Sequence, residues 1–336
     1  MCFKKNTNLQ QITRGHYIAL FKDFEQKHYW KKFKPNEEFK TDKKTSIYKI
    51  KMAKNPLTLK VAVVLNARNE EKHLGKTLEF LQAQQLKPYR IIVVNDGSTD
   101  KTGEIASSYD VEVVERKKRK ENFVARKELA ETVNAGLEKL DEDTDCDYIL
   151  LMSAEIHLPK NYLTEVVKRM ENNPKLVVAA GVIRNEYTVV PRGPGRVVKY
   201  DFWKKLGLRY PINYWYEGYL LWKAQSMGYE IASFGDIISN SDRKTGSTYE
   251  PKRYYYYGLG LKALGYSSPY AFARILIFAK KNPRGAYHML RGYLSDYNDL
   301  YEPELRKFVR KTQLNNIFHF NLEYLKRFLT GFKNSK

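Results

Sequence analysis

The chain of 336 residues contains 59 Lys and Arg against 38 Asp and Glu, which gives a formal net charge of +21, and 43% of its residues are hydrophobic. A mean hydropathy of −0.60, with no run of about 20 apolar residues, excludes a protein with several membrane-spanning helices. Its two cysteines, Cys2 and Cys146, exclude a disulfide scaffold and cannot alone build a tetrahedral zinc site.

The positive charge is concentrated at the two ends of the chain. Residues 1–60 balance to +10 and residues 243–336 to +12, whereas residues 61–242 balance to −1. A nucleic-acid-binding domain usually carries its basic patch on the folded domain itself, so we expect no nucleic-acid partner. Basic ends fit an anionic membrane surface, another polyanion or a solvated surface, and the sequence leaves these three open.

Residues 1–55 form a basic, aromatic-rich N-terminal appendage. Its apolar side chains recur at helical spacing and predict one amphipathic helix: Tyr17, Leu20, Phe21 and Phe24. The start of the chain shows no secretory signal, so we expect a cytoplasmic protein. The appendage can lie on a membrane, pack on the next domain or stay partly disordered.

From residue 57 onward, apolar runs alternate with helical patterns. The runs LTLKVAVVLNA, RIIVVND, VEVVE and DYILLMS are typical of strands that are buried on both faces. Helical spacing separates them, and Ser98 or Thr99 can cap the second helix. This alternation predicts a parallel sheet. Ligands of such sheets bind outside the carboxyl ends of the strands, here residues 66–70, 95–99 and 153–157.

Three carboxylates stand at these strand ends: Glu70, Asp96 and Glu155. Carboxylates at the mouth of a parallel sheet suit hydrogen bonding to a base or ribose, and they suit binding of a divalent metal. The chain has neither the G-x-G-x-x-G fingerprint after the first strand nor a P-loop. A nucleotide would therefore be held by side chains and a metal rather than by a glycine-rich loop.

Residues 61–103, with N-A-R-N-E-E and N-D-G-S-T-D about 25 residues apart, resemble the opening of the family 2 glycosyltransferases. The resemblance continues through DYILLMSAEIHLPKNYL and YEGYLLWKAQSMGYEI, and it covers roughly 60–235. It implies the α/β GT-A fold, with a mainly parallel central sheet flanked by helices and a helical C-terminal extension. It also implies an inverting enzyme that uses a nucleotide diphosphate sugar.

The resemblance, together with the position of residues that follow the later strands, predicts a donor site of seven residues. It places Ala67 and Glu70 beside the nucleobase and ribose, and Asp96 as the acceptor of a hydrogen bond from the base ring. The remaining four follow the later strands, and the last two of them could reach the phosphates: Ser153, Ala154, Arg243 and Lys244.

The family binds Mn²⁺ or Mg²⁺ through the last Asp of a D-x-D motif, and this chain has Ser153-Ala154-Glu155 there. Glu155 keeps a hard oxygen ligand, so the resemblance implies a metal at Glu155. Either the metal is held weakly through Glu155, water and phosphate, or basic residues partly replace it.

Inversion needs one carboxylate that deprotonates the acceptor hydroxyl. In the family this carboxylate precedes an Arg or Lys by six residues on a helix. Glu217 and Lys223 have this spacing, so we expect Glu217 to be the base. An acceptor sugar could stack on three nearby aromatic rings, which could equally lie in the core: Trp203, Trp215 and Tyr216.

These observations divide the chain into an appendage at 1–55, a GT-A catalytic domain at 56–242 and a basic helical region at 243–336. The segment PYAFARILIFAKKNPRGAYHMLRGYL is either an interfacial membrane helix or a helix packed on the domain. We expect transfer of a sugar to a hydroxyl of a glycan, a lipid-linked sugar or a protein. The alternatives are a non-catalytic sugar-nucleotide or glycan-binding homologue and a sugar nucleotidyltransferase.

Overall fold

The computed structural model of the chain describes residues 56–117, 126–141, 143–186, 190–243 and 251–315, all within one compact unit. The predicted amphipathic helix of the N-terminal appendage lies outside these residues. Within them, no helix has both the length and the apolar character needed to cross a bilayer.

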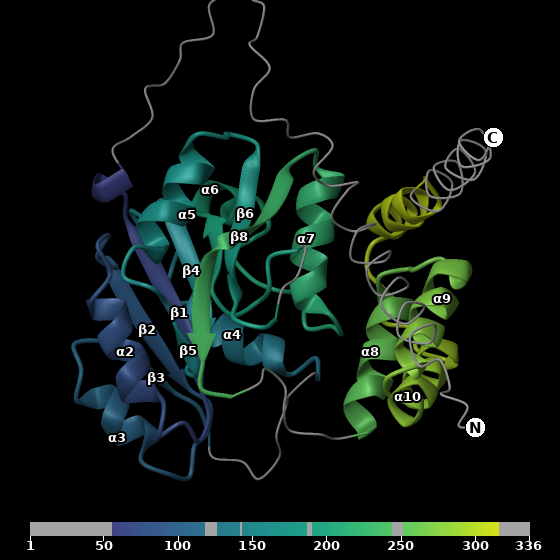
Figure 1. Ribbon diagram of the computed structural model, residues 1–336, viewed down its shortest axis with the longest axis horizontal. Coiled ribbons are helices and arrows are strands. Elements are labelled where there is room, and N and C mark those ends of the chain that lie inside the picture. Colours follow the sequence, from purple (N-terminus) through teal and green to yellow (C-terminus); the bar gives the residue numbers. More distant parts are fainter. Residues whose placement is uncertain (1–55, 118–125, 142, 187–189, 244–250, 316–336) are drawn as a thin grey trace, which may run out of the picture. The chain divides into compact units, whose positions relative to one another are not determined.

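The elements alternate as the apolar runs predict, and the strands gather in one sheet (Figure 1). The strands are β1 (Val61–Ala67), β2 (Arg90–Asn95), β3 (Glu112–Glu115), β4 (Tyr148–Ser153), β5 (Ile156–His157), β6 (Leu176–Ile183), β7 (Arg196–Lys199) and β8 (Glu230–Ser241). The helices are the short 3-10 turn η1 (Pro56–Thr58), α2 (Leu74–Gln82), α3 (Thr102–Ser107), α4 (Leu129–Leu137), α5 (Tyr162–Glu171), α6 (Tyr200–Lys205), α7 (Tyr216–Ser226), α8 (Pro251–Ala263), α9 (Ser268–Ala279) and α10 (Pro283–Leu294).

The sheet has the order β3-β2-β1-β4-β7-β6-β8-β5. Strands β3, β2, β1 and β4 are parallel to their neighbours. Strand β7 enters antiparallel between β4 and β6, while β6 and β8 are again parallel. The predicted mixed, mainly parallel α/β architecture is therefore confirmed. The parallel half brings the carboxyl ends of β1, β2 and β4 to one edge, where the expected site residues follow.

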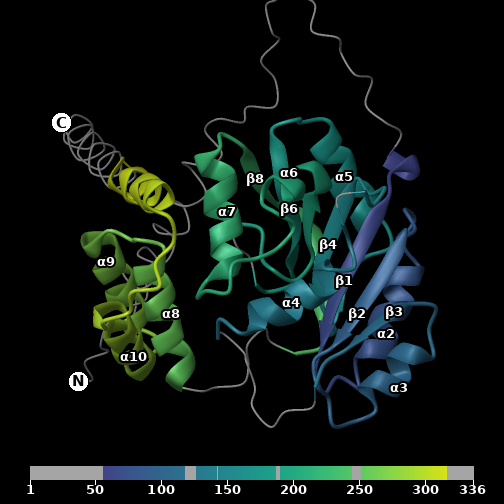
Figure 2. The ribbon, with the colours of Figure 1, turned by 180° about the vertical axis from the view of Figure 1, so that it is seen from behind.

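Alternating side chains of β1 explain why six of its seven residues are apolar. Val61, Val63 and Leu65 pack into a core with α2 and α5, and Ala62 and Val64 pack into a second core with α4, α6 and α7. Because helices cover both faces, neither side of the strand meets water. Figure 2 shows the sheet from behind with the helices of the second core.

The helices after residue 250 build a third core of their own. Helices α8 and α10 cross where Gly258 and Gly292 meet, and a Cβ added at Gly258 would come within 2.0 Å of the Met289 carbonyl oxygen. Only glycine permits this close approach of two backbones. This core is joined to the sheet through α7, because Tyr219 and Trp222 pack against it.

Candidate active site

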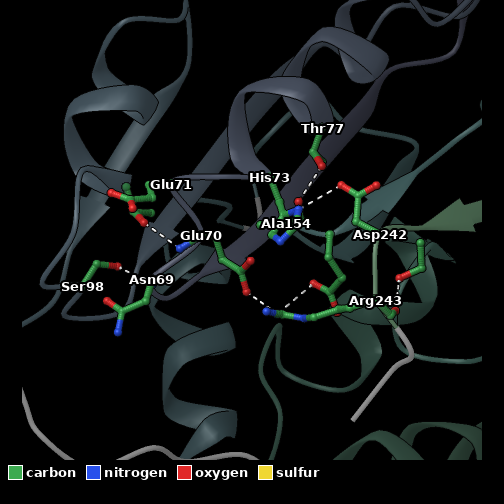
Figure 3. Close-up of polar contacts among 12 residues, drawn as sticks. Asn69, Glu70, Glu71, His73, Thr77, Ser98, Ala154, Asp242 and Arg243 are labelled. Atoms are coloured by element: carbon green, nitrogen blue, oxygen red, sulfur yellow. Dashed lines mark hydrogen bonds and ion pairs between the residues drawn. The ribbon is translucent and has the colours of Figure 1, made fainter. Parts of the chain in front are cut away.

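The loops that carry the two sequence motifs, residues 66–71 and 95–100, are hydrogen-bonded to each other at the edge of the sheet (Figure 3). They are called the motif loops below. Asn69, in the left-handed region with φ of 53°, donates its backbone N–H to Ser98 Oγ at 3.0 Å and accepts from the Thr99 backbone through Oδ1 at 2.9 Å. The backbone N–H of Glu70 donates to Thr102 Oγ1 at 2.8 Å. Much of the two sequence motifs thus serves to fix one loop against the other.

Asp96 is buried at the carboxyl end of β2, and its side chain faces a cation. The Arg116 Nε lies 3.2 Å from Asp96 Oδ1, and Arg68 donates to the Asp96 carbonyl oxygen at 2.7 Å. The sequence analysis did not single out Arg116. Its signal was its position directly after the third strand, at the same sheet edge as Asp96.

Glu70, Arg243 and Glu155 form a charged group that bridges β1, β8 and the end of β4 (Figure 3). Arg243 forms an ion pair and hydrogen bond with Glu70 Oε1, and its Nη2 lies 3.7 Å from Glu155 Oε2. Burial raises the pKa of Glu70 above its ordinary value; the Arg243 guanidinium opposes this and the Glu155 charge adds to it. Two carboxylates thus share one guanidinium.

Beside this group, Asp242 joins two histidines that the sequence reasoning did not connect. His73 Nδ1 lies 2.9 Å and His157 Nε2 lies 3.2 Å from Asp242 Oδ2. Burial lowers the pKa of His157, although the charge of Asp242 acts in the opposite direction. These contacts fix the end of β8, and with it Arg243, against the start of α2.

The other expected donor-site residues lie at the same edge. Ala67 ends β1 opposite Asn95 of β2, and the partly buried Ser153 ends β4. Ala154 is fully buried, and its carbonyl oxygen accepts from Thr77 Oγ1 at 2.5 Å. Lys244 lies outside the described residues.

Glu217 lies in the first turn of α7, with an exposed side chain. Its carboxylate rests against Gly193, where a Cβ would come within 2.0 Å of Glu217 Oε1. The buried Arg196 spans both segments, because it donates to the carbonyl oxygens of Pro191 at 2.9 Å and Glu217 at 3.4 Å. Lys223, six residues on, pairs with Glu302 at 2.5 Å.

The structure corrects two of the three expected aromatic contacts to an acceptor. Trp203 is 1% exposed and Tyr216 is 7% exposed, and both lie in the core beneath α6 and α7. Their rings are therefore not available to a sugar. Trp215 is only partly buried, but its ring packs against Gly260 and lies 5.4 Å from the Arg274 guanidinium.

The charged group fits a divalent cation in its chemistry, although the described residues contain no cluster of three or more His, Cys, Asp or Glu that could hold a metal ion by itself. Glu70 Oε2 is buried without a hydrogen-bond partner, and two carboxylates face one guanidinium. Hard oxygen donors with surplus negative charge suit Mg²⁺ or Mn²⁺ when phosphate and water supply the other ligands.

Comparisons with known proteins show what this chain is similar to. A segment of 55 residues is 46% identical to 4,4'-diaponeurosporenoate glycosyltransferase of Staphylococcus aureus, and it spans 16% of this chain and 14% of that relative. The mannosyltransferase PcManGT from Pyrobaculum calidifontis, solved in complex with GDP-Man and Mn²⁺, aligns over 89% of this chain and 83% of its own, with a TM-score of 0.51 and 16% identity. At that identity the likeness shows the fold alone, which is the GT-A type.

The family described as glycosyl transferase family 2 matches residues 62–227. This range runs from β1 to the end of α7, and it includes both interlocked motif loops, Glu155 and Glu217. Through residues 62–227, the chain belongs to glycosyl transferase family 2.

Proposed function

We propose that this chain is an inverting glycosyltransferase that moves a sugar from a UDP- or GDP-sugar to a hydroxyl group of a glycan, a lipid-linked sugar or a protein. The observation that carries the proposal is the edge of the sheet at the carboxyl ends of β1, β2 and β4. There the family's motif residues bring the buried carboxylates of Glu70, Asp96 and Glu155 to one edge of the sheet.

The nucleoside binds where the two motif loops meet. The Asp96 carboxylate accepts a hydrogen bond from the ring N–H of the base, and the base and ribose lie beside Ala67 and Glu70, as the family's pattern implies. Arg116, 3.2 Å from Asp96, holds that carboxylate in place while the donor is absent. Both uracil and guanine carry a ring N–H, so this contact serves either base.

The diphosphate lies beside the group of Glu70, Arg243 and Glu155. Glu155, with Glu70, would hold Mn²⁺ or Mg²⁺, and such an ion neutralises charge on the departing diphosphate. The guanidinium of Arg243, whose side chain is 44% exposed, supplies the protein's own positive charge to the phosphates.

Glu217 acts as the general base. It accepts the proton of the acceptor hydroxyl while that oxygen bonds to the anomeric carbon, and the bond from that carbon to the diphosphate oxygen breaks with its electron pair leaving on the diphosphate. Because attack occurs opposite the leaving group, the configuration inverts. Glu217 lies in the first turn of α7, near the positive end of the helix dipole.

The test has two stages. First, the melting temperature is measured with UDP and GDP, each with and without Mn²⁺ or Mg²⁺; a ligand at 100 times its dissociation constant adds about 2.7 kcal/mol. Second, sugar transfer from the matching nucleotide sugars is compared for the wild type, Glu217→Gln and Glu104→Gln. Glu104 is the matched control, because it is also an exposed glutamate in the first turn of a helix.

We expect Glu217→Gln to keep the nucleotide-induced shift and to lose about 10²- to 10⁴-fold in turnover, with Glu104→Gln unchanged. Equal turnover in both variants would refute the assigned base. A non-catalytic binding homologue is the second candidate, because Ser153 stands at a position where the family has Asp; it would show a nucleotide shift and no transfer. No shift with either nucleotide would contradict both.

A further inference from the structure

We propose that the outer face of α9 and α10 is a docking surface for an anionic lipid membrane. This inference goes beyond the transfer reaction, and it rests on the exposure, spacing and charge of side chains on these two helices. The two helices pack side by side with α8 in both ribbon views (Figures 1 and 2).

The inner faces of the two helices are fully used by the fold. On α9, Ala271 and Ile275 are buried, and on α10 Ala286 and Met289 are buried. All four belong to the core formed with α8 and the residues that follow α10. The outer faces add little to this core, apart from Phe272, whose ring centre lies 6.0 Å from that of Tyr293.

The outer faces nevertheless carry large apolar side chains. Eleven large hydrophobic side chains are exposed among the described residues, and five of these lie on the two helices: Phe272 at 40%, Leu276 at 68%, Ile277 at 41%, Tyr287 at 59% and Leu294 at 60%. On α9, Leu276 follows Phe272 by four residues and continues its side of the helix, and the adjacent Ile277 widens this apolar stripe. Exposed apolar patches of this kind mark interaction surfaces.

The charged side chains of α8, α9 and α10 and of the turns between them have a single sign. Residues 251–295 contain eight Lys and Arg and no Asp or Glu. Arg284 and Arg291 lie on the same exposed face of α10 as Tyr287, with Arg291 6.0 Å from the Tyr287 ring centre, and Lys281 is exposed in the turn between the helices. An apolar stripe edged by cations is the pattern of a helix that lies in the headgroup region of a membrane.

Size and chemistry select this occupant over others. Twelve residues of α9 are about 18 Å long, too short to cross a hydrocarbon core of about 30 Å, so the helix would lie on the membrane. A polyanion in water would use the cations and leave the exposed apolar surface of Leu276 and Ile277 in water. Anionic lipid satisfies both, because its headgroups meet the cations and its acyl chains meet the stripe.

The experiment measures flotation of the full chain with vesicles of phosphatidylcholine alone and of phosphatidylcholine mixed with phosphatidylglycerol. It needs neither donor nor acceptor, so its failure is distinct from a failure of the proposed transfer reaction. Two double variants probe the face: Leu276→Glu with Ile277→Glu, and Lys281→Glu with Arg284→Glu. The matched control is Lys168→Glu with Lys175→Glu, two exposed lysines on or after α5 with the same change in net charge.

We expect the wild type to float only with the anionic vesicles. Lys281→Glu with Arg284→Glu loses two attractive charges and should weaken binding at least about 25-fold. Leu276→Glu with Ile277→Glu, the apolar variant, should weaken it about tenfold or more. The control pair should change binding several times less than Lys281→Glu with Arg284→Glu. Unchanged melting temperatures confirm that the variants fold. Absence of wild-type flotation, equal loss in the control pair, or full binding by the apolar variant would each overturn the proposal. In the last case, displacement of the chain from the vesicles by heparin would identify a soluble polyanion as the partner.

Discussion

Replacement of Gly193 by alanine gives the sharpest test of where the base works. An alanine Cβ at this position would lie 2.0 Å from Glu217 Oε1 and 2.6 Å from its Cδ, whereas ordinary contacts begin near 3.4 Å. The carboxylate must therefore retreat by about 1.4 Å, and a misplacement of about 1 Å can cost about 10²-fold in rate. Because the Glu217 side chain is exposed, its displacement costs little stability.

We therefore expect Gly193→Ala to lower kcat for sugar transfer about 10²-fold, with the melting temperature and the nucleotide-induced shift unchanged. The assay is release of the nucleoside diphosphate in the presence of donor and acceptor. Gly235→Ala is the control, because a Cβ at Gly235 meets nothing within 4 Å. If Gly193→Ala turned over as fast as Gly235→Ala, Glu217 would not be the base in this position.

Three further predictions concern the core, the charged group and the metal. Gly136→Ala places a Cβ 2.6 Å from Val64 Cγ1, so urea unfolding should show a loss of about 1–2 kcal/mol; unchanged stability would contradict this packing. Because burial raises the pKa of Glu70, ionisation of Glu70 destabilises the fold as the pH rises above about 4.5. The melting temperature of Glu70→Gln minus that of the wild type should therefore increase as the pH rises. A difference that does not change with pH would refute this prediction. Glu155→Gln should abolish the part of the nucleotide shift that depends on Mn²⁺ and keep the rest, whereas a retained metal-dependent shift would exclude Glu155 as a ligand.

The sequence predicted the parallel half of the sheet well, because its strands are continuous apolar runs that are buried on both faces. The order of elements also placed Glu70, Asp96 and Glu155 at one edge, since that placement follows from the direction of the strands alone. The match to glycosyl transferase family 2 over residues 62–227 then included both motifs.

The contacts between distant segments were not predictable in this way. Arg243 reaches Glu70 across 173 residues of sequence and His73 reaches Asp242 across 169, and no local pattern encodes either contact. The burial of Trp203 was not predictable either, because the sequence pattern of a short helix does not show whether its aromatic residue faces the core or a sugar.

Helix α7 has a consequence for how this enzyme family could recombine. One of its sides packs on the sheet through Leu220 and Ala224, and the other packs on the later helices through Tyr219 and Trp222. The helix that carries Glu217 is therefore part of both cores and does not end an independently packed domain. A chimaera joined after β8 would function only if its new C-terminal half brought a surface that matched Tyr219 and Trp222, so the two halves of the chain are expected to be inherited together.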